Sequence, residues 1–197
     1  MLKRIGVLGG SFDPPHLGHI ICSLVVAEHL DLKKIILMPV AKQPQRLGGT
    51  YAGAEERYRM VEAISEIDPI FSPSRLELDR SGISYTVDTI EQLSEIYPSE
   101  EHQLYWIIGM DAAILFDSWR EPAKIVDSAK FAVMHRPGFT SDNIPVKWRD
   151  DMIIIPTPQI DISSTIVRQR ISKELPIRPW VGENVEKIIR DECLYIS

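Results

Sequence analysis

A segment near the start of the sequence combines the residue types that can bind phosphate groups and stabilise charge on them. It reads Gly9-Gly10-Ser11-Phe12-Asp13-Pro14-Pro15-His16-Leu17-Gly18-His19. The paired glycines allow backbone amides to approach phosphate oxygens closely, and Gly18 leaves space on the helix expected to follow. His16 and His19 lie three residues apart, so they share a face of the first helical turn. Two imidazoles beside a helix N-terminus suit an anion whose charge grows in a transition state.

Two simpler interpretations of this histidine pair exist. The segment could be a loop with two ordinary histidines, or the pair could supply half of a metal site. The metal interpretation needs a third ligand that the sequence does not nominate, so we expect no metal held by the protein alone. The segment also lacks the Gly-Lys-Ser/Thr ending of a Walker loop and the GxGxxG dinucleotide fingerprint. Because the glycines and prolines follow a predicted strand in this order, the functional interpretation is favoured.

A second segment, late in the sequence, offers hydroxyls and a cation at the start of a predicted helix. It reads Ile162-Ser163-Ser164-Thr165-Ile166-Val167-Arg168. The three hydroxyl residues can cap the helix and still leave backbone amides for a phosphate. Ser164 and Arg168 lie four residues apart and can grip one phosphate group. Taken alone, the segment is better explained as a capped surface helix with a solvated arginine. Together, the two segments predict two helix N-termini that face one polyphosphate.

Short apolar runs alternate with amphipathic stretches along most of the sequence. Strands are predicted over 3–9, 34–39, part of 71–79, 104–109, 131–135 and 152–156, and helices over 16–30, 54–65, 86–97, 111–127, 163–173 and 184–192. Residues 40–53 are glycine-rich and aperiodic, which predicts a mobile loop. The alternation indicates an α/β fold: a doubly wound, Rossmann-like parallel sheet with helices on both faces and a small helical C-terminal end. Ligands of such sheets bind at the carboxyl ends of the strands, where the strand order reverses.

The composition fits one globular domain of ordinary size. The 197 residues are 44% apolar and 25% charged, and 22 basic and 28 acidic side chains give a net charge of −6. No basic stripe dominates, so nucleic acid is not an expected partner, whereas a small polyphosphate remains compatible with this balance. No apolar run is long enough for a membrane span or a signal peptide, so no membrane partner is expected. Cys22 and Cys193 lack CxxC spacing, which indicates a reduced, cytoplasmic protein.

Both segments resemble signatures of the nucleotidyltransferase superfamily, the first its HxGH signature and the second its ISSTxxR signature. Three further segments resemble the bacterial nicotinate-nucleotide adenylyltransferases within it: Arg80–Thr89 its RxGxSYTxDT, Ile107–Asp111 with Trp119 its IGxD and following tryptophan, and His135–Gly138 its RPG. The resemblance runs from Ile5 to about Ile171 and on to the closing helix. It implies a single nucleotidyltransferase domain over 1–197, in which about 160–197 form a helical C-terminal subregion that carries the second signature.

The resemblance implies a direct in-line transfer of an adenylyl group in the biosynthesis of NAD. The 5′-phosphate of nicotinate mononucleotide would attack the α-phosphorus of Mg·ATP and give deamido-NAD and pyrophosphate. No covalent enzyme intermediate is expected, so catalysis would rest on positioning and charge stabilisation. Mg²⁺ is inferred from polyphosphate chemistry rather than from a cluster of ligands. Two alternatives stay open: a different acceptor (the amide mononucleotide or phosphopantetheine), or a nucleotide-binding regulator without turnover.

The resemblance also assigns residues to the site. Catalysis would fall to His16, His19 and Arg168, with His19 stabilising the transition state. ATP would be bound by Gly9, Gly10, Ser11, Phe12, Gly18, Ser163, Ser164, Thr165 and Arg168. Nicotinate mononucleotide would be bound by Arg46, Tyr85, Thr86, Gly109, Asp111, Trp119 and Arg136.

Simple physical chemistry supports the acceptor-binding assignments. An electron-poor pyridine ring stacks well on an aromatic face, and its carboxylate needs amides or a hydroxyl. A pocket that offers only donors should favour the carboxylate, because the NH₂ of an amide would meet another donor. Taken alone, a tryptophan at position 119 is more often a core residue than a platform for a ligand, and Tyr85 equally fits packing at a strand edge. Asp111 could accept a hydrogen bond from a ribose hydroxyl and equally fits a helix N-cap.

One segment departs from the pattern of the family. Where relatives usually have PPHK or PWQK, this sequence has Lys42-Gln43-Pro44-Gln45-Arg46. Arg46 keeps the positive charge and can fork onto a phosphate, with a geometry that differs from that of lysine. Arg136 is expected near the nucleotides, with a surface salt bridge as its alternative. The sequence sets neither the strictness for the acid over the amide nor the oligomeric state, and it leaves a homo-oligomer open.

Overall fold

In the computed structural model of the protein, which describes residues 2–42, 49–80, 82–135 and 139–196, six parallel strands form one sheet. The strands are β1 (Lys3–Gly10), β2 (Lys34–Pro39), β3 (Phe71–Pro73), β4 (His102–Gly109), β5 (Lys130–Met134) and β6 (Met152–Ile155). Their order across the sheet is β3-β2-β1-β4-β5-β6. This is the doubly wound order of Rossmann-like folds, so the predicted fold class is confirmed.

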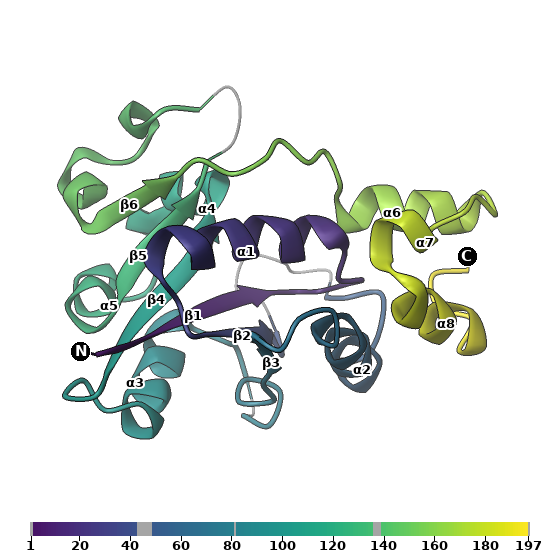
Figure 1. Ribbon diagram of the computed structural model, residues 1–197, viewed down its shortest axis with the longest axis horizontal. Helices are drawn as coiled ribbons and strands as arrows, with labels where there is room; N and C mark the ends of the chain where they lie inside the picture. The colour runs from purple at the N-terminus through teal and green to yellow at the C-terminus, as the bar shows by residue number, and fades with distance from the viewer. Residues whose placement is uncertain (1, 43–48, 81, 136–138, 197) are drawn as a thin grey trace.

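Eight α-helices and three short 3₁₀ helices surround the sheet within the described part of the chain (Figure 1). The α-helices are α1 (Leu17–Leu30), α2 (Ala54–Ser65), α3 (Thr86–Ile96), α4 (Met110–Ile114), α5 (Pro122–Ser128), α6 (Ser164–Ser172), α7 (Arg178–Val181) and α8 (Glu183–Asp191). The 3₁₀ helices are η1 (Phe116–Ser118), η2 (Ser141–Asn143) and η3 (Val146–Asp151). Figure 1 shows α1 across the front of the sheet and α6, α7 and α8 gathered at one end beside α2.

Both faces of the sheet are buried because successive strand residues point to opposite sides. Leu8 and Ile35 join one apolar core, which also contains residues of α1, α2 and α8. Their neighbours Val7 and Ile36 join a second core, which contains residues of α3, α5 and η1. Strands covered on both faces must be apolar at nearly every position, and the continuous apolar runs in the sequence have this origin.

The order of the strands reverses between β1 and β4, which pair in parallel at the middle of the sheet. β1 ends at Gly10 and β4 ends at Gly109, so the loops that follow these two strands leave the sheet side by side. The segment before α1, which ends at His16, therefore lies at the switch point. The end of β4 at Gly109, just before α4, lies there too.

The single helix predicted over 111–127 is wrong. The structure divides this stretch into α4, η1 and α5, and Glu121 adopts a left-handed conformation with φ 52 immediately before Pro122. Proline lacks the amide proton and clashes with the preceding turn, so it begins a new helix and cannot continue the old one. The short strand predicted within 71–79 is present as β3, which ends at Pro73. The helices η2, η3 and α7 were not predicted, because such short helices carry no 3.6-residue periodicity.

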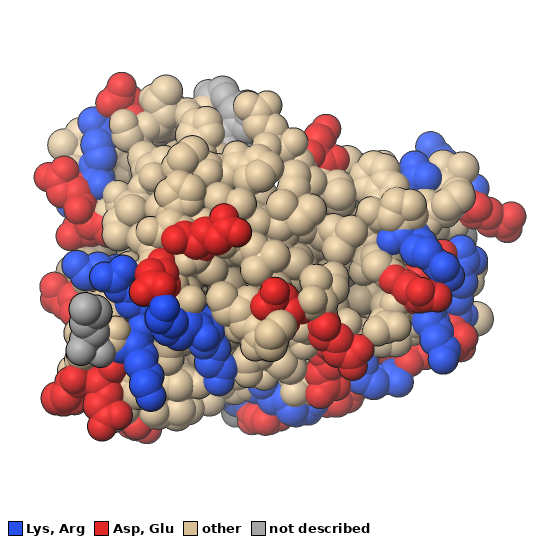
Figure 2. All heavy atoms as spheres, in the orientation of Figure 1, with Lys and Arg blue, Asp and Glu red and all other residues tan. Residues whose placement is uncertain are grey.

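The surface carries mixed charge on the face seen in Figure 2. Lysine and arginine side chains are interspersed there with aspartate and glutamate, and the middle of that face is largely uncharged. Among the residues that the structure describes, no helix has the length and apolarity that crossing a bilayer requires.

Gly182, which joins α7 to α8, provides a test of the C-terminal part of the fold. Its φ of 84 and ψ of 166 lie in a region that is open essentially to glycine alone. We expect Gly182→Ala to lower the free energy of unfolding by about 1–3 kcal/mol, measured by urea denaturation. Gly9→Ala is the matched control, because it also removes one glycine and its Cβ would meet the nearest atom at an ordinary 3.5 Å. Equal losses in the two variants would contradict a backbone cause.

Candidate active site

A buried carboxylate holds the loop that follows β1. Asp13 has no exposed surface, and its two carboxylate oxygens accept hydrogen bonds from three donors. The amides of Tyr51 and Ala52 donate at 2.8 and 3.0 Å, and the Tyr195 hydroxyl donates at 3.0 Å. The proximity of the Asp13 charge adds to burial in raising the pKa of Tyr195. One side chain thus connects the loop after β1, the segment before α2 and the C-terminal region.

A buried arginine ties the same loop to the end of β2. The Nη1 of Arg57 donates to the carbonyl oxygens of Ser11 and Val40 at 2.9 and 2.8 Å. Burial lowers the pKa of Arg57, although an arginine remains charged at neutral pH. Neither Asp13 nor Arg57 has a role that was predicted from the sequence. One signal was present: Arg57 falls on the same stripe of α2 as the buried residues Met60 and Ile64.

The two histidines form one stacked unit at the start of α1. His16 is the N-cap residue, and its backbone amide donates to Nδ1 of His19 at 3.2 Å. The ring centres of the two imidazoles lie 3.7 Å apart with an interplanar angle of 23°. Gly18 is needed beside this unit, because a Cβ at that position would lie 3.0 Å from Nδ1 of His16. The ring of Phe12 meets the ring of His19 edge-on at 5.0 Å.

Both imidazoles are neutral at neutral pH. Burial, and then the charge of His19, lower the pKa of His16 to about 2, and burial lowers the pKa of His19 to about 4. Because Nδ1 of His19 accepts a backbone hydrogen bond, the proton of the neutral ring resides on Nε2. His19 therefore presents an N–H donor that can bind a phosphate oxygen without carrying a charge of its own.

The N-terminus of α6 lies beside this histidine unit, as the sequence predicted. Ser163 caps α6 by accepting a hydrogen bond from the amide of Ile166 at 3.2 Å, and the Ser164 hydroxyl donates to the carbonyl oxygen of Pro14 at 2.8 Å. A cavity of about 670 Å³, hereafter the phosphate cavity, lies between the two helices. Its lining includes His16, Gly18, His19, Gly109, Asp111, Ser163 and Ser164.

Arg168 of α6 contacts the loop that follows β1. Its Nη1 donates to the carbonyl oxygen of Asp13 at 2.6 Å, and its Nη2 donates to the hydroxyl of Thr165 at 3.1 Å. Its guanidinium carbon also lies 4.2 Å from the centre of the Tyr51 ring. Arg168 lines neither the phosphate cavity nor the second cavity, and the same holds for Ser11, Phe12 and Thr165. The phosphate-binding role of Arg168 stays a prediction.

The second cavity, hereafter the ring cavity, has a volume of about 340 Å³. It brings together predicted residues that are far apart in the sequence: Gly9 and Gly10 of β1, Tyr85 and Thr86 at the start of α3, Gly109 at the end of β4, and Trp119 after η1. Its lining also includes His19, which together with Gly109 and Met134 lines the phosphate cavity too. The two cavities therefore meet beside the imidazole of His19.

The aromatic side chains of the ring cavity combine packing with exposure. The Trp119 ring lies 5.2 Å from Phe116 and 6.3 Å from Phe131, centre to centre, so its inner side belongs to the core while the residue also lines the cavity. Tyr85 is the N-cap residue of α3.

The N-cap alternative for Asp111 is wrong, because Gly109 caps α4 and Asp111 lies inside its first turn. Arg46, Gln45 and Arg136 lie outside the described residues, as do residues 43–48 of the predicted mobile loop.

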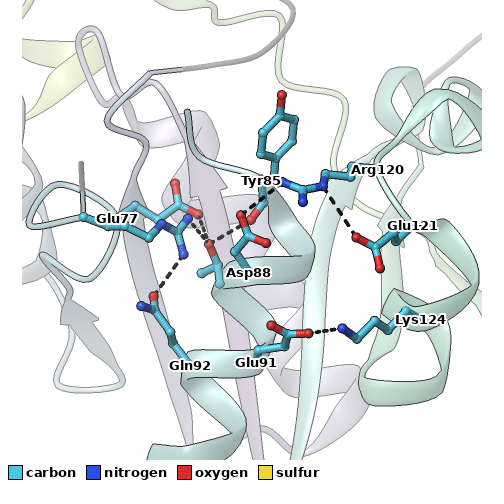
Figure 3. A network of polar contacts seen from close by, with 10 residues as sticks. Glu77, Tyr85, Asp88, Glu91, Gln92, Arg120, Glu121 and Lys124 are labelled. Carbon is cyan, nitrogen blue, oxygen red and sulfur yellow. Dashed lines mark hydrogen bonds and ion pairs between the residues drawn. The ribbon is translucent and has the colours of Figure 1, made fainter. Parts of the chain in front are cut away.

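A polar network that was not predicted reaches the ring cavity through one of its members, Glu77 (Figure 3). The hydroxyl of Thr89 donates to Oε1 of the buried Glu77 at 2.7 Å, and Arg80 donates to Thr89 and to Gln92 at 2.8 and 2.9 Å. Oε2 of Glu77 has no hydrogen-bond partner within the described structure. Burial raises the pKa of Glu77, while Thr89, Ser84 and Arg80 oppose this effect. No signal in the sequence indicated this network, because it joins α3 to Glu77 and Arg80, which lie in a segment without periodicity.

Comparison with known proteins identifies the family. A family model described as cytidylyltransferase-like matches residues 7–170. The sheet, with the histidine unit at its switch point, is that of a nucleotidyltransferase, and the chain belongs to the cytidylyltransferase-like family. The chain is 34% identical over 200 residues to a protein of Desulfitobacterium hafniense named "Probable nicotinate-nucleotide adenylyltransferase", with 98% of this chain and 96% of the relative covered. Within the family, the chain is a member of the nicotinate-nucleotide adenylyltransferases.

Further relatives agree with this membership. A protein of Corynebacterium glutamicum with the same name is 37% identical over 194 residues, with 98% of this chain and 88% of the relative covered. Among solved structures, the Plasmodium falciparum nicotinic acid mononucleotide adenylyltransferase complexed with APC has a TM-score of 0.77 at 22% identity, covering 98% of this chain and 97% of that chain. The same enzyme complexed with NaAD also has a TM-score of 0.77, at 21% identity. These two structures share the fold.

Removing the donors or the charge at Asp13 tests the loop anchor. We expect Tyr195→Phe to cost about 1 kcal/mol of unfolding free energy, because one hydrogen bond to a carboxylate is lost. Asp13→Asn should cost more, about 2–4 kcal/mol, because its NH₂ would face one of the backbone amides that now donate to the carboxylate. Urea denaturation of both variants and of the double variant measures the coupling. Fully additive losses would show that Tyr195 and Asp13 do not interact.

The neutral histidines predict a defined pH dependence of stability. Below the ordinary histidine pKa of 6.5, the unfolded chain binds protons that His16 and His19 in the folded protein do not bind until pH falls to about 2 and about 4. Stability should therefore fall on acidification below pH 6.5, by about 1.4 kcal/mol per pH unit for each histidine. The variant His16→Asn/His19→Asn keeps a capping side chain and should lack this part of the slope between pH 7.5 and 5. Identical slopes for the variant and the wild type would contradict the assignment.

Proposed function

We propose that the protein transfers the adenylyl group of Mg·ATP to the 5′-phosphate of nicotinate mononucleotide, forming deamido-NAD and pyrophosphate. The observation that carries this proposal is the meeting of two cavities at His19, one flanked by two helix N-termini and the other lined by aromatic side chains. A reaction between two phosphorylated substrates needs adjoining sites with a shared donor where they meet. Membership of the nicotinate-nucleotide adenylyltransferases supports this choice of substrates.

ATP would occupy the phosphate cavity. The N-termini of α1 and α6 supply partial positive charge and free backbone amides there, which suits the β- and γ-phosphates. Gly9, Gly10, Ser11 and Phe12 would pass beside the adenosine. Ser163, Ser164 and Thr165 would bind phosphates through the first turn of α6, and Arg168 would join them if its guanidinium turns from the Asp13 carbonyl toward the ligand.

His19 would stabilise the reacting phosphates directly. In the in-line step, an oxygen of the acceptor phosphate forms a bond to the α-phosphorus while the bond to the β-phosphate breaks, and negative charge grows on the departing pyrophosphate. The Nε2–H of His19 can donate to an oxygen that carries part of this charge. His16 would fix the orientation of the His19 ring by stacking on it and through its backbone amide.

Nicotinate mononucleotide would occupy the ring cavity. The pyridine ring would stack on Trp119 beside Tyr85, and the hydroxyl and amide of Thr86 would bind its carboxylate. Gly109 allows the ligand to approach the end of β4, and Asp111 would accept a hydrogen bond from a ribose hydroxyl. Arg46 and Arg136 complete the proposal as cations near the phosphates.

The divalent ion belongs to the substrate in this proposal. The described residues contain no group of three or more His, Cys, Asp or Glu side chains arranged to hold a metal ion, so the ion would be carried by the phosphates of ATP. Mg²⁺ is the proposed ion. The proposal also treats residues 1–197 as one domain whose helical subregion begins at about 160, in a cytoplasmic protein whose two cysteines carry free thiols.

Release of pyrophosphate from Mg·ATP tests the reaction and the acceptor together. The assay is run in parallel with nicotinate mononucleotide, nicotinamide mononucleotide and phosphopantetheine. We expect fast release with the acid mononucleotide and slow release with the other two. Release only with phosphopantetheine would assign another acceptor, and tight binding of ATP without release in any arm would indicate a regulator.

The role of His19 has its own test. We expect His19→Asn to lower kcat/KM about 10²- to 10³-fold, because it removes a donor to the transition state. Asparagine can still accept the hydrogen bond from the His16 amide, so the start of α1 is kept. His29→Asn, at an exposed position on the same helix, is the matched control and should leave kcat/KM unchanged. An unchanged rate in the His19 variant would exclude this role.

A further inference from the structure

The ring cavity contains one arginine that neither the motifs nor the proposed reaction uses. Arg120 follows Trp119 directly and lies in the short connection between η1 and α5. It is the only lysine or arginine among the described residues that line this cavity. His19, which also lines the cavity, is neutral because burial lowers its pKa to about 4. The described lining therefore has a single permanent cation.

The guanidinium of Arg120 is held in place by weak contacts. Its central carbon lies 4.8 Å from the centre of the Tyr85 ring, while its nearest carboxylate oxygens belong to Asp88 at 3.7 Å and Glu121 at 3.5 Å. Figure 3 shows Arg120 beside Tyr85, with these two acidic side chains on either side. Both ion-pair distances exceed the 2.7–2.9 Å that is typical of a charge-assisted hydrogen bond. The side chain is 51% exposed, so a stronger anion can engage its N–H donors.

An acidic residue, Glu77, also lines the ring cavity and opposes the binding of an anionic ligand. Glu77 contributes a carboxyl group with one buried oxygen that has no partner in the described structure. The ring cavity is therefore not lined by donors alone, which is the condition under which a pocket selects a carboxylate without further help. Because this oxygen is buried, Glu77 acts on a ligand only through its charge, and when ionised it repels a carboxylate.

We propose that Arg120 is a specificity-determining residue that pairs with the carboxylate on the pyridine ring of the acceptor and so favours the acid mononucleotide over its amide. This inference rests on the proposed function, since it concerns the acceptor of that reaction. The planar fork of a guanidinium matches the two oxygens of a carboxylate. The NH₂ group of an amide offers only donors to the same fork, so one contact would be lost and a donor would face a donor.

Three variants separate this role from a general effect of charge. Arg120→Gln removes the cation, and Arg120→Lys keeps the charge without the fork. Lys124→Gln is the matched control, because Lys124 pairs with Glu91 on the outer side of the same region and does not line the cavity. For each variant, kcat/KM is measured with nicotinate mononucleotide and with nicotinamide mononucleotide, and thermal unfolding checks that the fold is kept.

We expect Arg120→Gln to lower kcat/KM for the acid by roughly 10- to 100-fold and to change the value for the amide by less than about threefold, as the loss of one charge-assisted interaction predicts. Arg120→Lys should fall between the wild type and the glutamine variant, and Lys124→Gln should match the wild type with both substrates. The ratio of the two kcat/KM values is the decisive quantity, because a merely structural role would lower both together.

Two failures can be told apart. If the wild type releases pyrophosphate with the acid mononucleotide and the acid-to-amide ratio of Arg120→Gln equals that of the wild type, the inference about Arg120 is wrong and the proposed function stands. If the wild type releases no pyrophosphate with the acid mononucleotide, the proposed function itself fails. A variant that loses activity equally with both substrates overturns the specificity role.

Discussion

A carboxylate without exposed surface is tolerated only when its oxygens are fully supplied with donors, and Asp13 is the group on which the site depends in this way. Its donors come from the segment before α2 and from Tyr195, so the loop after β1 is fixed by parts of the chain that are far apart in sequence. The buried Phe12, with its φ of 46, adopts a conformation that an aromatic residue rarely takes. The Asp13 and Arg57 contacts on either side of it hold that conformation in place and thereby set the position of the histidine unit.

The two cavities obtain their electrostatic character in different ways. The phosphate cavity is lined by two helix N-termini and by uncharged imidazoles, so it keeps no isolated cation away from water. The ring cavity instead has a guanidinium at its edge, where solvent and two carboxylates share the charge. A polyphosphate brings several negative charges of its own and can induce protonation of the imidazoles, whereas a ring carboxylate brings one and needs a cation that is already present.

The sequence predicts the fold class, most element bounds and the residues that meet at the switch point, because periodicity and motif order are local properties. It does not show that the helical stretch predicted over 111–127 is divided at Glu121 and Pro122. It gives no role to Asp13, Arg57 or Glu77, whose importance comes from burial and from partners distant in sequence. Arg120 could not be singled out for a related reason: the sequence does not show that the fold places its guanidinium beside Tyr85.

The bond between Tyr195 and Asp13 spans 182 positions of the chain. During synthesis, the loop that carries the histidines therefore emerges from the ribosome long before its last anchor exists. At about 5–20 residues per second, this interval lasts on the order of 10–40 s. Over that time the β1 strand and the loop after it can be formed only incompletely, so a nascent chain cannot bind its nucleotide in the final geometry. The loop that carries the histidines is therefore among the last parts of the molecule to reach its final geometry.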